Sequence, residues 1–176
     1  LPLDELPDER KQLTLGMYGE GDFFDMKGVV EGVFDKLGIR QDLIFKPADD
    51  RPYLHPGRKA DIIAGETAIG FLGEIHPDVL DNYNIGTKAY VAVLDVKMLA
   101  GLADFGVKYK GVAKFPAVTR DISLVMKKEV LAGQVEAVIH KYGGKLLESC
   151  RLFDVYEGEQ IGPDEKSLAY SIQFRA

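Results

Sequence analysis

The nine residues Ser167-Leu168-Ala169-Tyr170-Ser171-Ile172-Gln173-Phe174-Arg175 alternate between apolar side chains and side chains that are polar or small. A repeat of two residues is typical of a β-strand with one buried face, because successive side chains of a strand point to opposite sides. We therefore predict one face in a core and one open, polar face. The inward set is Leu168, Tyr170, Ile172 and Phe174, and the outward set is Ala169, Ser171, Gln173 and Arg175.

Three segments upstream of this strand give the order strand, helix, strand, strand. Arg120–Met126 alternates in the same way, and Leu147–Tyr156 is predicted to be a long strand. Between them, Leu131–Tyr142 carries an apolar stripe at helical spacing and is followed by two glycines. This order begins a ferredoxin-like split βαβ fold. A complete fold of this kind needs a second helix and a fourth strand. We therefore expect the domain to be C-terminally truncated; the alternatives are a disordered tail or another chain that covers the exposed sheet face.

The open face of this small sheet is the candidate binding surface. If Phe153 and Val155 point inward, their neighbours on the strand point outward. Such a surface suits single-stranded RNA, because an aromatic ring stacks on an unpaired base and a carboxylate accepts hydrogen bonds from a base edge. The pattern alone favours the alternative of an ordinary solvated sheet face with a surface tyrosine. The outward set predicted here is Asp121, Ser123, Val125, Leu152, Asp154 and Tyr156.

The first part of the chain is predicted to be an α+β module built on an antiparallel sheet. The predicted strands are Lys11–Tyr18, Leu43–Lys46, Lys59–Ala64, Ala68–Ile75 and Lys88–Leu94. A helix is predicted after Asp25 as N-cap, another after His76, and a third over Val96–Leu102. We place this module at residues 1–104, a linker at 105–119 and the ferredoxin-like domain at 120–176.

Composition and charge exclude several classes of protein. The 176 residues include one cysteine and three well-separated histidines, which argue against a disulfide framework and a zinc site. No apolar run is long enough to cross a membrane, and the N-terminus does not resemble a signal peptide. The net charge of −6 lies entirely before Val112, since the part from Val112 onward carries nine basic and nine acidic residues. Only this neutral part is a candidate for contact with RNA, and without a basic patch its affinity would be modest.

Several short strings, in a fixed order, resemble motifs of a known family. They are Asp22-Phe23-Phe24-Asp25-Met26-Lys27-Gly28, Leu54-His55-Pro56-Gly57-Arg58, Ile69-Gly70-Phe71-Leu72-Gly73-Glu74-Ile75-His76-Pro77, Phe115-Pro116-Ala117-Val118-Thr119-Arg120-Asp121, and Leu152-Phe153-Asp154-Val155-Tyr156-Glu157-Gly158 followed by Lys166-Ser167-Leu168-Ala169. Each string is a weak signal, but the ordered set spans almost the whole chain. The set resembles the β subunit of bacterial phenylalanyl-tRNA synthetase, and the last two strings resemble its anticodon-binding domain.

The resemblance implies a role for each module. The first would be part of a class II synthetase-like core that has lost catalysis, and the second would bind the tRNA anticodon. By motif matching, Asp154 would contact an anticodon base edge, Tyr156 would stack on a base, and Ser123 would lie beside them. Arg120 would contact a backbone phosphate. His55 and His76 each precede a proline and are interpreted as turn residues, with His76 as a helix cap.

The resemblance also implies partners and a reaction for the parent enzyme. The partners are tRNA-Phe and the synthetase α subunit, in a heterotetramer of two α and two β chains, with no membrane partner. The parent would attach phenylalanine to tRNA-Phe with ATP and Mg²⁺, while this chain would hold no catalytic residue, metal or cofactor. The expected location is the cytoplasm. The alternatives left open are a ferredoxin-like small-molecule regulatory module and a protein-interaction module.

Overall fold

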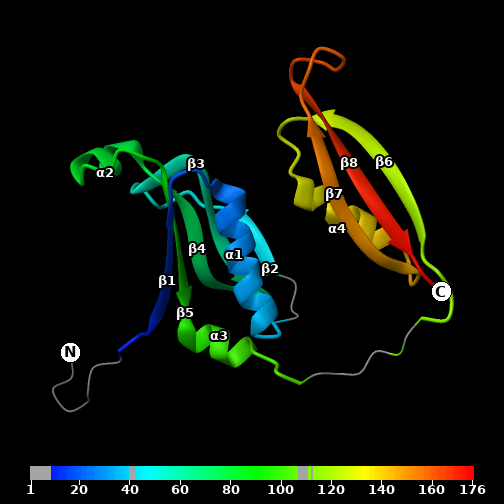
Figure 1. Cartoon of the computed structure of the whole chain (residues 1–176), viewed down its shortest axis with the longest axis horizontal. Helices are drawn as coiled ribbons and strands as arrows, with labels where there is room; N and C mark the ends of the chain where they lie inside the picture. Colours follow the sequence, from blue (N-terminus) through cyan, green and yellow to red (C-terminus); the bar gives the residue numbers. More distant parts are fainter. Residues whose placement is uncertain (1–8, 40–42, 107–110, 112) are drawn as a thin grey trace. The chain divides into compact units, whose positions relative to one another are not determined.

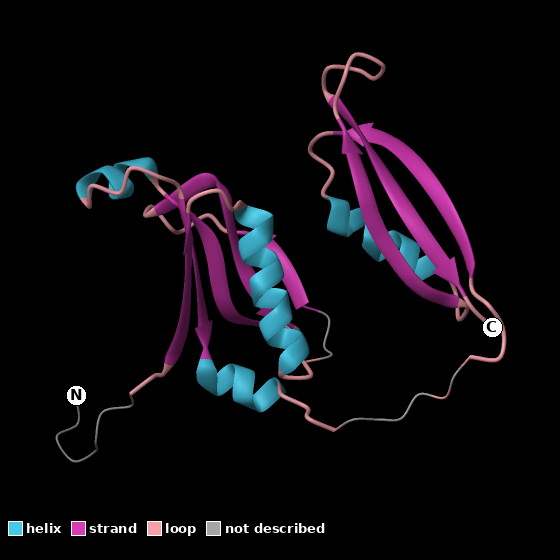
Figure 2. Ribbon diagram, viewed as in Figure 1, coloured by secondary structure: helices cyan, strands magenta, loops and turns pink. Residues whose placement is uncertain are grey.

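A computed structural model describes residues 9–39, 43–106, 111 and 113–176 of the chain, which divides into two compact units at residues 1–108 and 109–176. Both units are α+β, and each contains one antiparallel sheet (Figure 2). The prediction of an α+β chain with two antiparallel sheets is confirmed. The predicted linker at 105–119 lies partly outside the described residues, and the division between the units falls within it.

The first unit is built on a five-stranded sheet in the order β1-β5-β4-β3-β2, in which every neighbouring pair is antiparallel. In the described part of this unit, three helices connect or flank the strands. The strands are β1 (Gln12–Tyr18), β2 (Leu43–Pro47), β3 (Leu54–Ala64), β4 (Thr67–Ile75) and β5 (Ala89–Asp95), and the helices are α1 (Phe23–Lys36), α2 (Pro77–Asn82) and α3 (Val96–Leu102).

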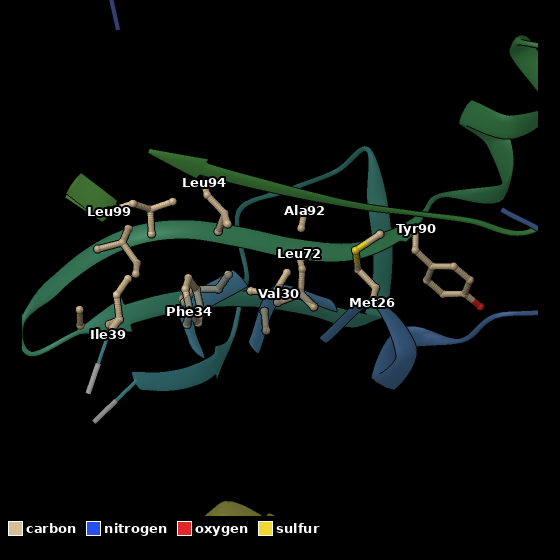
Figure 3. Close-up of a cluster of buried hydrophobic side chains, with 13 residues drawn as sticks. Met26, Val30, Phe34, Ile39, Leu72, Tyr90, Ala92, Leu94 and Leu99 are labelled. Atoms are coloured by element: carbon tan, nitrogen blue, oxygen red, sulfur yellow. The ribbon is translucent and has the colours of Figure 1, made fainter. Parts of the chain in front are cut away.

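Helix α1 lies across one face of this sheet (Figure 1). Its buried side chains are Met26, Val30 and Phe34, which are four residues apart and so form one stripe along the helix. They pack on the central strands of the sheet in one core, with Leu72 of β4 and Leu94 of β5 fully buried beside them (Figure 3). The stripe therefore fixes which face of the sheet α1 covers.

The N-terminus of α1 differs from the prediction by one turn. Asp22, not Asp25, is the N-cap, and its Oδ1 accepts hydrogen bonds from the backbone N–H groups of Phe24 and Asp25 at 2.7 and 2.8 Å. Asp25 reaches back, and its Oδ2 accepts from the N–H of Asp22 at 2.8 Å. The prediction of Asp25 as the cap is wrong because the two carboxylates form a reciprocal capping box, in which Asp25 is the third helical residue.

The second unit has the order β6 (Val118–Lys127), α4 (Ala132–Tyr142), β7 (Leu147–Tyr156) and β8 (Glu165–Phe174). Its sheet has the order β6-β8-β7, with β8 antiparallel to both neighbours. Strands β6 and β7 are therefore parallel to each other, and α4 is the crossover between them. This arrangement is the predicted split βαβ unit with β8 inserted at the centre.

Helix α4 covers one face of the three-stranded sheet. Leu168, Tyr170 and Ile172 of β8 are buried, and Val135 and Ile139 of α4 pack against them. The inward set predicted for the strand at residues 167–175 is thus confirmed. Within the described part of the second unit, α4 is the only helix, so the opposite face of this sheet carries none.

Candidate functional site

The face of the second sheet that points away from α4, here called the open face, consists of four rows of side chains that run across the strands. Residues directly opposite each other on neighbouring antiparallel strands share a face, so the strand register defines each row. From one end of the sheet to the other, the rows are Val125–Ser167–Tyr156, Ser123–Ala169–Asp154, Asp121–Ser171–Arg151 and Thr119–Gln173–Ser149.

Three of the four predicted site residues lie together in the first two rows. Ser123 and Asp154 are both opposite Ala169, and Tyr156 is opposite Ser167. The hydroxyls of Ser123 and Ser167 are 2.8 Å apart and share a hydrogen bond. Ala169, at the centre of the second row, has a small side chain, so the surface is recessed between Ser123 and Asp154. The structure therefore brings together two hydroxyls, a carboxylate and a phenol on one surface.

Tyr156 is held against the turn that follows β7. Its side chain is 39% exposed, and a Cβ placed at Gly158 would overlap the phenol ring. A larger residue at position 158 would therefore require the Tyr156 ring to shift. The backbone of the turn thus limits where the ring can lie.

Arg120 lies on the other face of the sheet. It is opposite Ile172, a buried residue of the core beneath α4, so its side chain leaves the strand on the α4 side. The residue is exposed, and its Nη1 donates a hydrogen bond to the carbonyl oxygen of Thr119 at 3.1 Å. The structure does not bring Arg120 together with Ser123, Asp154 and Tyr156.

A β-bulge in β7 changes which of its side chains reach the open face. The register skips one residue between Leu152 and Asp154, so Leu152 packs in the core and Phe153 lies on the open face. The predicted orientations of Leu152 and Phe153 are wrong, because a bulged residue interrupts the alternation of a strand. Asp154 and Tyr156 are nevertheless on the predicted side, since their pairing resumes after the bulge.

Two features of this surface were not predicted as site residues. Ser167 completes the hydroxyl pair with Ser123. The sequence does indicate its position, because the alternation of the strand places Ser167 on the same face as Ala169 and Ser171. Phe153 shows 54% of its side chain to solvent. It lines a shallow, open trough of about 400 Å³ with Asp121, Arg151 and Ser171. No regular pattern in the sequence indicates this position.

The motif residues of the first unit have structural roles. Arg58 Nη1 donates to both carboxylate oxygens of Glu74, at 3.0 and 2.9 Å, which ties the string at 54–58 to the string at 69–77. His55 Nδ1 accepts from the N–H of Gly57 at 3.1 Å, and His76 Nδ1 accepts from the N–H of Asp78 at 3.3 Å as the N-cap of α2. The interpretation of both histidines as turn or cap residues agrees with these contacts.

Two further features are absent from the described residues. None of the helices in residues 9–39, 43–106 or 113–176 has the length and apolar character needed to cross a membrane. The same residues contain no group of three or more His, Cys, Asp or Glu side chains placed to hold a metal ion.

Each of the two units matches a known protein family, and the two matches together define the class of protein. Residues 113–176 match the family described as the ferredoxin-fold anticodon binding domain. Residues 2–96 match the family described as the phenylalanyl tRNA synthetase beta chain CLM domain. The class is therefore that of tRNA synthetase subunits with a C-terminal anticodon-binding domain.

Curated relatives agree over nearly the whole chain. The chain is 46% identical over 170 residues to the phenylalanine–tRNA ligase beta subunit of Clostridium tetani, covering 97% of this chain and 21% of the relative. It is 43% identical over 165 residues to that of Bacillus subtilis, covering 94% of this chain and 20% of the relative. The chain belongs to the family of phenylalanine–tRNA ligase beta subunits and spans about a fifth of the length of these relatives. The family resemblance inferred from the motifs is confirmed.

Proposed function

We propose that the open face binds unpaired anticodon nucleotides of tRNA-Phe, as part of a ligase that charges this tRNA with phenylalanine. The observation that carries the proposal is the grouping of Ser123, Ser167, Asp154 and Tyr156 on a sheet face that no described helix covers. Single-stranded RNA is read in this way, with splayed bases stacked on aromatic rings and hydrogen-bonded through their edges.

Each residue has a chemical role in the proposal. Tyr156 offers a ring for stacking and a hydroxyl at its tip. Asp154 accepts hydrogen bonds from amino or imino groups of a base edge. The Ser123–Ser167 pair supplies one further donor and one further acceptor, because each hydroxyl can do both. Arg120 as a phosphate contact stays a prediction, supported by motif matching and not by its position on the sheet.

The first unit is proposed to be a non-catalytic, class II synthetase-like core that supports assembly with an α subunit, in a complex of two α and two β chains. The family match over residues 2–96 supports this assignment. The Arg58–Glu74 pair and the His76 cap are consistent with motifs kept for structure. ATP and Mg²⁺ belong to the parent enzyme, which we place in the cytoplasm, and we assign them no residue of this chain.

The test uses a ligase assembled from the α subunit and a β subunit that contains this chain. Tyr156→Ala should weaken tRNA-Phe binding by about 1–3 kcal/mol, the range for loss of one base–aromatic stack. Tyr156→Phe keeps the ring and should bind nearly as well as the parent. Asp154→Ala should raise the KM for tRNA-Phe while leaving the KM for phenylalanine unchanged. If neither alanine variant weakens the use of tRNA, anticodon contact by the open face is wrong.

The shape of the surface argues against the small-molecule alternative. Ligand pockets usually bury at least about 70% of a small ligand, whereas the trough beside Phe153 is shallow and open. Titration of the chain with phenylalanine decides the point. A saturable rise in melting temperature would support a regulatory site, because a ligand that binds only the folded state stabilises it.

A further inference from the structure

The half of the open face beyond the proposed anticodon residues carries a second set of groups suited to a nucleotide. This half consists of the third and fourth rows together with Phe153, and its side chains line the trough of about 400 Å³. It is distinct from the grouping around Tyr156, which lies in the first two rows.

We propose that this half binds a second unpaired nucleotide, whose base stacks on Phe153. Arg151 contacts its phosphate, and Asp121 with Ser171 contacts the base edge. The inference rests on the proposed function, because it extends the same RNA along the same sheet face.

Phe153 has the exposure expected of a stacking platform. The residue is 54% exposed on a face whose other side chains are mostly polar, and it does not belong to the core beneath α4. The bulge in β7 places it there, between the second and third rows. Bulges commonly re-aim a side chain at functional sites. The flat face of an unpaired base can stack on an exposed aromatic ring.

The third row supplies polar groups next to this ring. Asp121 and Arg151 are both opposite Ser171, so they stand two strand spacings apart, about 9.6 Å. Within the described residues neither side chain has a salt bridge, so both remain available to a ligand. A guanidinium suits a phosphate, and a carboxylate suits the donors of a base.

The spacing of the two rings favours two different bases. Tyr156 is opposite Ser167, whereas the bulged Phe153 falls between the residues opposite Ala169 and Tyr170, two to three residues further along β8, which corresponds to about 7–10 Å. Rings on opposite faces of one base would be about 6.8 Å apart, twice the stacking distance of about 3.4 Å. The open face is therefore long enough for two unstacked nucleotides, with one ring for each.

The experiment titrates the full chain at low ionic strength with an anticodon stem–loop RNA of tRNA-Phe sequence and measures Kd by fluorescence anisotropy. Phe153→Ala and Phe153→Leu should each weaken binding by between about 5-fold and 150-fold, the loss of one stack. Phe153→Tyr keeps a ring and is the matched control. Unfolding curves of the variants check that the second unit stays folded, as expected for a side chain outside the core.

A second series replaces one loop nucleotide at a time by an abasic residue. The effect of Phe153→Ala should vanish at one abasic position and the effect of Tyr156→Ala at a different one. If Tyr156→Ala weakens binding and Phe153→Ala does not, the second nucleotide site is wrong and the proposed function stands. If both effects vanish at the same position, the two rings serve one base and the inference is also wrong. If neither variant weakens binding, the proposed function fails as well.

Discussion

At the scale of single residues, Tyr170 places a phenol inside the core of the second unit. The side chain is fully buried, and its hydroxyl donates a hydrogen bond to the carbonyl oxygen of Ala132 at 3.1 Å. Burial, with smaller contributions from the nearby Glu136 and Cys150, raises the pKa of Tyr170 to about 12. A phenolate is disfavoured there because apolar surroundings do not solvate it and a carbonyl cannot donate to it. The fold therefore depends on the protonated form.

This dependence predicts a loss of stability in alkali. Between about pH 10 and pH 12, an unfolded tyrosine releases its proton while folded Tyr170 keeps it, so the free energy of unfolding falls as the pH rises. The slope due to this residue should approach about 1.4 kcal/mol per pH unit. The contribution of Tyr170 is measured by urea unfolding of the parent and of Tyr170→Phe across this pH range. The difference between the two slopes isolates this contribution, because the other titrating groups are common to both proteins. Equal slopes for the two proteins would contradict the assignment.

At the scale of secondary-structure elements, the strands and helices of both units follow from periodicity. The alternation over residues 167–175 correctly predicts the buried face of β8, because the second unit has only one core to pack against. The cap of α1 was misplaced because Asp22 and Asp25 are both good cap residues and the choice depends on backbone geometry. The bulge at Phe153 has no periodic signal at all. The bulge is a shift in the register between β7 and β8, and the alternation of side chains within β7 alone cannot reveal such a shift.

The capping box of α1 gives the element-scale prediction. Asp22→Ala removes the acceptor of two backbone N–H groups and should lower the free energy of unfolding by about 1 kcal/mol. Asp22→Ser retains a capping oxygen and should recover most of that loss. Asp25→Ala should cost less, since Asp25 accepts a single bond from Asp22. Urea midpoints measure all three, and a larger loss at Asp25 than at Asp22 would show that the cap is assigned to the wrong residue.

At the scale of the whole molecule, charge is divided unevenly along the chain. The net charge of −6 lies before Val112, and the part that contains the open face is neutral. The four rows of that face contain one basic residue, Arg151, and two acidic ones, Asp121 and Asp154. RNA affinity therefore has to come mainly from stacking and hydrogen bonds, because few phosphates can be neutralised.

The salt dependence of RNA binding tests this division and separates the two candidate phosphate contacts. For the anticodon stem–loop, the slope of log K against log salt should correspond to no more than about two phosphates, or about −1.4. Arg151→Gln should make the slope shallower by about 0.7, the value for one phosphate on a single strand. Arg120→Gln is the matched control, because Arg120 leaves β6 on the α4 side of the sheet. If the slope changes at Arg120 and not at Arg151, the RNA follows the motif-based assignment, and the phosphate contact proposed for the trough is wrong.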